Sequence, residues 1–160
     1  MSTRSGDLDP GILLYLFNEK NLSSLQVNKI VNHQSGLLGV SEVSSNMKEL
    51  LAKESENTDA AEAVELFCLQ AKKYIGAFAA LLGGVDMLVF TGGIGENSAP
   101  IRERICRNME FLGIHLDFNR NNANTSVISK ADSPVVVRVM KTNEELMIAR
   151  HTRKCVQQLE

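Results

Sequence analysis

The chain has 160 residues, of which 44% are hydrophobic and 22% are charged, a composition typical of a globular protein with a real core. The net charge of -2 and the lack of a basic cluster exclude non-specific nucleic-acid binding, and no apolar run is long enough to span a membrane. We therefore expect a single domain over residues 1–160, with no nucleic-acid or membrane partner.

Three short helices are predicted in the first third of the chain. Pro10 fits the first turn of one helix, a second amphipathic helix begins near Ser24, and Ser45 is a candidate N-cap for the third. Residues 35–41 are rich in small side chains and predict a loop between the second and third helices.

The longest helix is predicted to begin at Thr58 or Asp59 and to run to about Leu82. Its C-terminal end is apolar nearly all round, which predicts a central, buried helix. Gly83 and Gly84 are expected to end it, because glycine readily adopts the left-handed conformation that closes many helices.

A strand, a glycine-rich turn and a further helix are predicted next. The apolar stretch 85–90 has the length of a buried strand, and GGIG follows at residues 92–95. Glycines let a backbone approach an anion closely, and Ser98 is a candidate N-cap for the helix that begins near Pro100. The pattern is typical of a phosphate-holding turn, but an ordinary strand-to-helix turn has it too. The glycine spacing excludes a dinucleotide fingerprint, and the lack of a following lysine excludes a Walker loop.

The last third of the chain predicts two strands and a terminal helix. Residues 119–124 are rich in Asn and predict a surface loop, residues 126–129 are a short strand candidate, and residues 134–140 are a clearer one. Thr142 or Asn143 is expected to cap the terminal helix. A helix followed by a strand suggests an α/β unit.

Cysteine usage predicts the compartment. Three cysteines fall in helical patterns without the spacing of metal ligands: Cys68, Cys106 and Cys155. Buried or half-buried thiols in a reducing cytosol are therefore predicted in preference to disulfides. No secretory signal precedes the globular sequence, so we expect a cytoplasmic protein.

Arg4 lies in a polar turn beside two carboxylates, Asp7 and Asp9. From composition alone, a salt-bridged turn explains this arrangement. Arginine also suits recognition of a carboxylate or phosphoryl group, because its planar fork binds two oxygens and stays charged.

Four motifs, in this order, resemble those of the acetate kinases, which belong to the acetate/sugar kinase and actin superfamily. They are TRSGDLDPG from Thr3, SGLLG from Ser35, GGIGENS from Gly92 and TNEEL from Thr142. The resemblance covers essentially the whole chain and implies that it corresponds to the C-terminal portion of such a kinase, without the N-terminal domain. The implied fold is α/β, part of an actin-like ATPase (ribonuclease H-like) domain with long helices packed on a small sheet.

The resemblance also implies roles for individual residues. Arg4 would be the catalytic side chain, meeting the carboxylate substrate and the transferring phosphoryl group. Glu144 would help to hold Mg²⁺, an ion that needs only one or two protein carboxylates. Two segments would bind ATP or ADP, comprising Asn46, Met47 and Lys48, and Gly93, Ile94, Gly95, Glu96 and Asn97.

This sequence departs from the family pattern at a few positions. The family usually has Asp-Met-Arg where this chain has Asn46-Met47-Lys48. Asparagine retains a hydrogen bond to a ribose hydroxyl, whereas lysine does not stack on adenine as a guanidinium does. Glu42 replaces a common glycine and Lys141 a usual proline, and these changes concern nucleotide affinity more than fold.

The implied function is acetate kinase activity, the reversible ATP-dependent phosphorylation of acetate to acetyl phosphate, in a homodimer that uses Mg²⁺. The motifs that carry the family's catalytic aspartate and histidine are absent from these 160 residues. The isolated chain is therefore expected to be inactive. Two alternatives stay open. One is a propionate kinase, and the other is a non-catalytic truncated module that binds nucleotide or mediates dimerisation.

Overall fold

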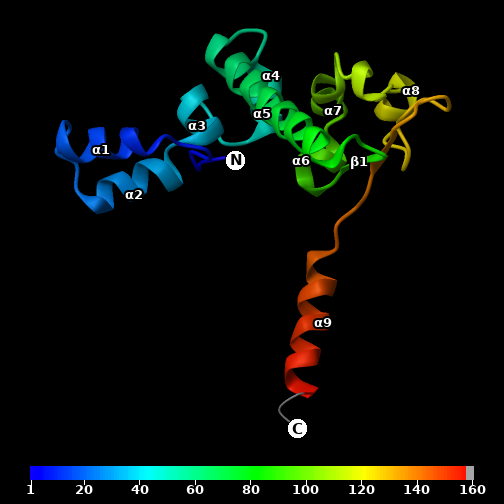
Figure 1. Ribbon diagram of the computed structural model, residues 1–160. Coiled ribbons are helices and arrows are strands. Elements are labelled where there is room, and N and C mark those ends of the chain that lie inside the picture. Colours follow the sequence, from blue (N-terminus) through cyan, green and yellow to red (C-terminus); the bar gives the residue numbers. More distant parts are fainter. Residues whose placement is uncertain (158–160) are drawn as a thin grey trace. The chain divides into compact units, whose positions relative to one another are not determined.

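The computed structural model of the chain describes residues 1–157, apart from the side chain of Glu144. The chain divides into two compact units, Met1–Ala77 and a second unit that begins at Phe78 (Figure 1). A single domain over residues 1–160 stays a prediction. Within the described part of the chain, every helix is too short or too polar to cross a membrane.

The first unit is helical. It contains α1 (Pro10–Asn18), α2 (Ser24–His33), α3 (Gly36–Ser41), α4 (Met47–Lys53) and most of α5 (Thr58–Leu82). Asp9 caps α1 by accepting a hydrogen bond from the Gly11 N–H, and Ser23 with Gln26 forms a capping box at α2. These caps satisfy backbone donors at the helix starts, and the helices predicted from Pro10 and near Ser24 are confirmed.

Two predictions about the short helices are wrong. Residues 35–41 do not form a loop, because all but the first belong to α3. Gly36 adopts φ +62°, which turns the chain from α2 into α3 at a position where a Cβ would collide with backbone. Asn46 caps α4 in place of Ser45, since its Oδ1 accepts a hydrogen bond of 3.0 Å from the Lys48 N–H.

Helix α5 has the predicted bounds, but its C-terminal end is not buried. Phe78, Leu81 and Leu82 are 57%, 81% and 78% exposed. The core of the first unit draws instead on the N-terminal half of α5 and on the shorter helices, through Val27, Leu37, Met47, Leu50, Ala60, Ala63, Val64 and Cys68. The apolar sequence at this end of α5 therefore predicted burial wrongly, because a helix is buried only where a neighbouring element covers it.

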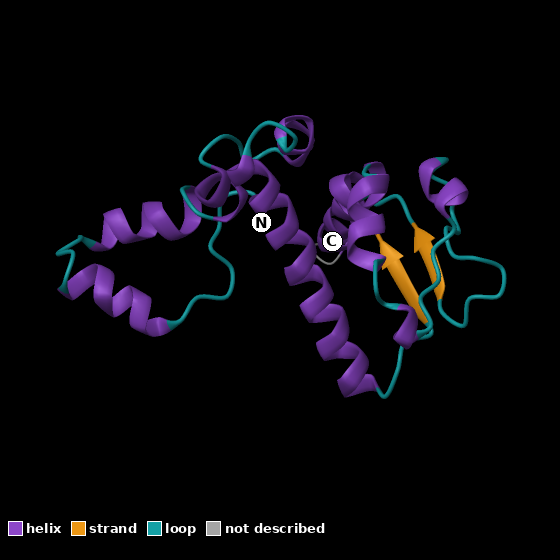
Figure 2. Cartoon of the chain, turned by 90° about the horizontal axis from the view of Figure 1, so that it is seen from above, coloured by secondary structure: helices purple, strands orange, loops and turns teal. Residues whose placement is uncertain are grey.

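The second unit contains the small sheet. It follows Gly83 with β1 (Met87–Phe90), α6 (Gly92–Asn97), α7 (Ala99–Cys106), a short 3₁₀ helix η1 (Glu110–Leu112), α8 (Phe118–Asn122), β2 (Val136–Val139) and α9 (Glu144–Gln157). β1 and β2 pair in parallel, with Met87 opposite Val136 and Phe90 opposite Val139 (Figure 2). The buried side chains of this unit include Phe90, Ile101, Ile105, Cys106, Met109, Ile114, Leu116, Ile128, Val135 and Val137.

The strand predictions are confirmed in part. The clearer candidate at residues 134–140 contains β2, whereas residues 126–129 form isolated bridges to Leu116 and Arg138 and no strand. β1 is shorter than residues 85–90 and is not fully buried, since Met87 and Val89 are 48% and 40% exposed.

Three further predictions in the second unit need correction. The Asn-rich segment 119–124 is exposed as predicted except for Asn121, which is fully buried, but residues 119–122 belong to α8 and are not a loop. Ser98 precedes α7, but its side chain makes no capping hydrogen bond. Cys68 and Cys106 are buried as predicted, whereas Cys155 is exposed.

Candidate functional site

Two of the sequence motifs follow the carboxyl ends of the parallel strands. GGIGENS begins two residues after Phe90, the last residue of β1, and TNEEL begins three residues after Val139, the last residue of β2. The Met140 N–H donates a hydrogen bond of 2.9 Å to the Phe90 carbonyl. Because the strands are parallel, both motifs lie at the same edge of the sheet, the usual position of ligand sites in α/β proteins.

Glu96 joins the two motifs directly. Its Oε1 accepts hydrogen bonds from the Thr142 N–H at 2.8 Å and from the Thr142 hydroxyl at 3.0 Å. The same oxygen accepts from the Gly92 N–H at 3.0 Å. The hydrogen bonds from Thr142 lower the pKa of the Glu96 carboxyl group, and Gly92 and the positive charge of Lys141 act in the same direction.

The glycines of the first motif occupy a short helix, α6, and not an open turn. Gly92 starts this helix with φ +72°. A Cβ at Gly93 would meet no atom within 4 Å, so the space beside its Cα is open. A Cβ at Gly95 would instead approach the Phe90 carbonyl carbon to 3.3 Å, where α6 packs on the end of β1. Gly95 therefore serves packing, whereas Gly93 faces open space.

Arg102, on α7, supports α6 from the protein interior. Its side chain is fully buried, and its Nη1 donates to the carbonyls of Gly95 at 2.8 Å and Glu96 at 3.1 Å. Burial lowers the pKa of this guanidinium, because a charged group loses its hydration in the interior. The hydrogen bonds fix the C-terminal end of α6.

Two asparagines complete the environment of Arg102. Its Nε donates to Asn121 Oδ1 at 2.8 Å, and its Nη2 donates to the Asn121 carbonyl at 2.9 Å and to Asn124 Oδ1 at 2.5 Å. Asn121 in turn donates to the Ala99 carbonyl at the start of α7. The sequence placed Arg102 directly after the glycine-rich motif but predicted no buried role for it, and it predicted both asparagines on the surface, which holds for Asn124 and not for Asn121. The available signal was an arginine next to Ile101 on the apolar face of α7.

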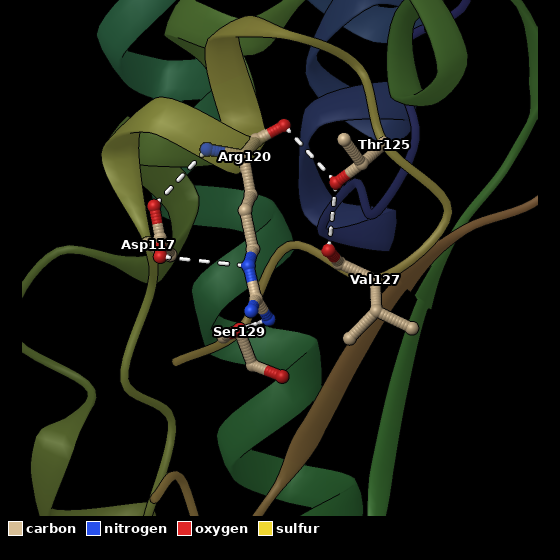
Figure 3. A network of polar contacts seen from close by, with 5 residues as sticks. All are labelled: Asp117, Arg120, Thr125, Val127 and Ser129. Carbon is tan, nitrogen blue, oxygen red and sulfur yellow. Dashed lines mark hydrogen bonds and ion pairs between the residues drawn. The ribbon is translucent and has the colours of Figure 1, made fainter. Parts of the chain in front are cut away.

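A second polar network holds the segment that carries these asparagines (Figure 3). Asp117 caps α8 by accepting from the Arg120 N–H at 3.0 Å, and it also forms an ion pair of 3.6 Å with the Arg120 side chain. Arg120 Nη1 donates to the Ser129 carbonyl, and the Thr125 hydroxyl donates to the Val127 carbonyl. These contacts connect α8 to the segment between α8 and β2 and fix the conformation of that segment.

In the first unit, two other motifs pack against each other. The Ser35 N–H donates to the Thr3 carbonyl at 2.9 Å, and the Ser5 N–H donates to the Val31 carbonyl at 2.8 Å. A Cβ at Gly36 would lie 2.9 Å from the Arg4 carbonyl oxygen, so only glycine allows this approach. SGLLG therefore supports the backbone of Arg4, whose side chain is exposed.

Both carboxylates near Arg4 in sequence have other partners. Asp7 accepts a hydrogen bond from the Tyr74 hydroxyl and lies 3.4 Å from Lys73 Nζ. The Tyr74 hydrogen bond, followed by Lys73, lowers the pKa of Asp7, and the same contact raises the pKa of Tyr74. Asp9 caps α1. These contacts tie the Arg4 loop to α5 and α1, beside a hollow of about 600 Å³ that Asp7 and Tyr74 help to line.

The predicted adenosine-side triplet begins α4. Asn46 uses its Oδ1 as the helix cap, Met47 lies in the core with 5% of its surface exposed, and Lys48 is exposed. Lys48 is thus the member of the triplet most open to a ligand. Nucleotide binding by this triplet stays a prediction.

Glu144 is the first residue of α9, but its side chain lies outside the described residues. Asn143 caps α9 through a hydrogen bond of 2.9 Å from the Leu146 N–H to its Oδ1, as predicted. The described side chains contain no group of three or more His, Cys, Asp or Glu able to hold a metal ion.

Residues 1–150 match the Acetokinase family. The chain is 48% identical over 160 residues to the acetate kinase of Clostridium novyi (strain NT), covering 98% of this chain and 40% of that protein. It is 46% identical over 151 residues to the propionate kinase of Yersinia enterocolitica, covering 94% of this chain and 37% of that protein. The crystal structure of Porphyromonas gingivalis acetate kinase superposes with a TM-score of 0.89 at 44% identity, covering 98% of this chain and 40% of that one.

The structural likeness confirms the predicted fold, α/β and part of an actin-like ATPase domain. The chain spans about 40% of the length of the curated relatives named here.

Proposed function

This chain belongs to the acetokinase family, and from that premise we propose that it forms part of an acetate kinase. The reaction is the reversible transfer of the γ-phosphoryl group of ATP to acetate, which gives acetyl phosphate and ADP. We further propose a cytoplasmic homodimer. Phosphoryl transfer requires little covalent chemistry of the protein, so positioning and positive charge carry most of the catalysis.

The proposal rests mainly on the contact between Glu96 and Thr142. This contact unites the glycine-rich motif with the motif that carries Glu144, at the carboxyl edge of the parallel strands. The sequence separation between the two is large, so their meeting is a property of the fold. It supports a common site for the nucleotide and its metal ion.

Each site residue has one task in the proposed reaction. The open space at Gly93 admits the adenosine side of the nucleotide to the backbone of residues 93–97, and residues 46–48 contact the adenosine as well. Glu144 would hold Mg²⁺, which when bound neutralises charge on the phosphate oxygens. Arg4 binds the acetate carboxylate and orients it toward the transferring phosphoryl group.

Two alternatives to this proposal concern the substrate that accepts the phosphoryl group and whether the chain takes part in catalysis. The likeness to the Yersinia enterocolitica propionate kinase favours propionate as the second candidate acceptor. Because the chain spans about 40% of its relatives, a non-catalytic module that binds nucleotide or mediates dimerisation is the candidate from another class.

Gly93→Val is expected to abolish nucleotide binding without unfolding the chain. The added side chain would enter the open space beside α6, which the nucleotide is proposed to occupy, and its Cβ would meet no atom outside α6 within 4 Å. A thermal-shift titration with Mg-ADP measures this as loss of the nucleotide-dependent rise in melting temperature.

Gly76→Val provides the matched control, because Gly76 is also helical and also has open space beside its Cα. This variant should keep the response of the unchanged chain to Mg-ADP. Full protection of a folded Gly93→Val chain would contradict the proposed nucleotide site.

The isolated chain is expected to associate into a homodimer or larger assembly and to form no acetyl phosphate. Large apolar side chains on α5 and β1 are exposed, including Leu69 at 58% and Leu81 at 81%, and such surfaces recruit partners. Light scattering measures the mass, and trapping of acyl phosphate with hydroxylamine measures the activity. A monodisperse monomer would refute the first expectation, and acetate-dependent product above the blank would refute the second.

A further inference from the structure

The carboxylate of Glu96 is already engaged within the protein. The hydrogen bonds that its carboxylate accepts within the described part of the chain, two from Thr142 and one from Gly92, all reach Oε1. A ligand that contacted this oxygen would have to displace charge-assisted hydrogen bonds of 2.8 to 3.0 Å. The geometry therefore favours a role for Glu96 that is different from direct contact with the nucleotide.

The backbone of Glu96 is held on the opposite side. Its carbonyl accepts a hydrogen bond from the buried guanidinium of Arg102, which also holds the Gly95 carbonyl. The C-terminal end of α6 is thus fixed to the interior through its backbone, while the side chain of Glu96 extends to Thr142. A displacement of α6 would consequently be transmitted to Thr142 through a short side chain.

The segment that contains Thr142 is exposed and lies between two elements of secondary structure. Lys141, Thr142 and Asn143 are all exposed, and they form the connection between the end of β2 and the start of α9. The Met140 N–H donates a hydrogen bond to Phe90 of β1 just before this connection, and Asn143, its last residue, caps α9. Both donors of Thr142 that the structure describes go to Glu96, so this contact holds the chain two residues before α9 begins.

We infer that Glu96 is a positioning residue that couples α6 to the first turn of α9, so that nucleotide at Gly93 and the placement of Glu144 depend on each other. The nucleotide part of this inference rests on the proposed function. The contact itself does not, because it exists in the chain without nucleotide. Exposed polar contacts open readily, which makes this connection adjustable by a ligand.

Amide hydrogen exchange, followed by NMR on the intact chain without nucleotide, tests the contact. Glu96→Ala removes the acceptor, and the amides of Gly92 and Thr142 should then exchange about tenfold faster or more. Glu96→Gln keeps an oxygen acceptor without the charge and should restore part of the protection. Thr142→Val removes only the hydroxyl donor, and its effect should not add to that of Glu96→Gln, because the two groups form one contact.

Glu103→Gln is the matched control. Glu103 is a partly exposed carboxylate on α7 that lies 3.6 Å from Arg107 and does not contact Thr142. This variant should leave exchange at Gly92 and Thr142 unchanged. Unchanged exchange in Glu96→Ala would overturn the inference, whether or not the chain binds nucleotide.

A second exchange experiment, with Mg-ADP added, distinguishes failure of the coupling from failure of the proposed nucleotide site. In the unchanged chain, protection should increase in residues 92–98 and also in residues 142–147. In Glu96→Ala, bound nucleotide should still protect residues 92–98, but the effect on residues 142–147 should be lost. Equal protection of residues 142–147 in both proteins would overturn the coupling. Absence of any response in the unchanged chain would overturn the proposed nucleotide site and the coupling, while the exchange rates without nucleotide would still decide whether the contact exists.

Discussion

Arg4→Ala is expected to lower the turnover of a complete kinase by about a thousandfold with little change in its melting temperature. The side chain is exposed, so its removal costs little packing, whereas the proposed reaction needs its charge beside the acetate carboxylate and the phosphoryl group. A suitable enzyme is a hybrid in which residues 1–160 replace the matching 40% of the Clostridium novyi acetate kinase. Initial rates of acetyl phosphate formation measure the effect.

Arg4→Lys and Arg107→Ala sharpen this experiment. Lysine retains the charge but lacks the planar fork, so it should restore only a small part of the turnover. Arg107 is exposed on the surface near Glu103, and its replacement should leave turnover unchanged. Near-normal turnover of the Arg4→Lys hybrid would contradict a bidentate role for Arg4.

Arg102→Met is expected to lower the free energy of unfolding of the chain by about 4 kcal/mol, because it removes a buried guanidinium that donates to buried and half-buried carbonyl and amide oxygens. The oxygens left without donors belong to Gly95, Glu96, Asn121 and Asn124. Methionine fills much of the same volume, so the loss reports on hydrogen bonding more than on a cavity. Urea denaturation followed by circular dichroism measures the change in free energy.

Arg107→Ala is again the comparison, since it removes an exposed arginine from the region just after α7. Its ion pair with Glu103 is solvent-exposed, and the expected change in stability is below about 1 kcal/mol. Arg102→Lys should lose most of the stability that Arg102→Met loses, because a single ammonium group does not reach acceptors on both sides of the guanidinium. An Arg102→Met chain as stable as the unchanged one would show that the buried network contributes nothing.

Local sequence patterns determined most of the elements of this protein. The helices α1, α2, α5 and α9, the strand β2 and the glycine-rich segment after β1 were predictable, because caps, periodicity and glycine act over a few neighbouring residues. The Asn143 cap of α9 is one example, since the cap and its target Leu146 lie within one helical turn. The motifs that place the chain in its family are likewise continuous stretches of sequence.

The tertiary structure decided burial and the polar contacts of the candidate site. Asn121 was predicted to lie on the surface. It is buried, and its oxygens accept hydrogen bonds from Arg102, 19 residues earlier. Glu96 was predicted only as part of a nucleotide-binding segment. In the structure its carboxylate accepts a hydrogen bond from Thr142, 46 residues later. The end of α5 looked like core and is exposed. In each case the outcome depends on which distant group comes within a few ångströms, and local periodicity carries no information about that.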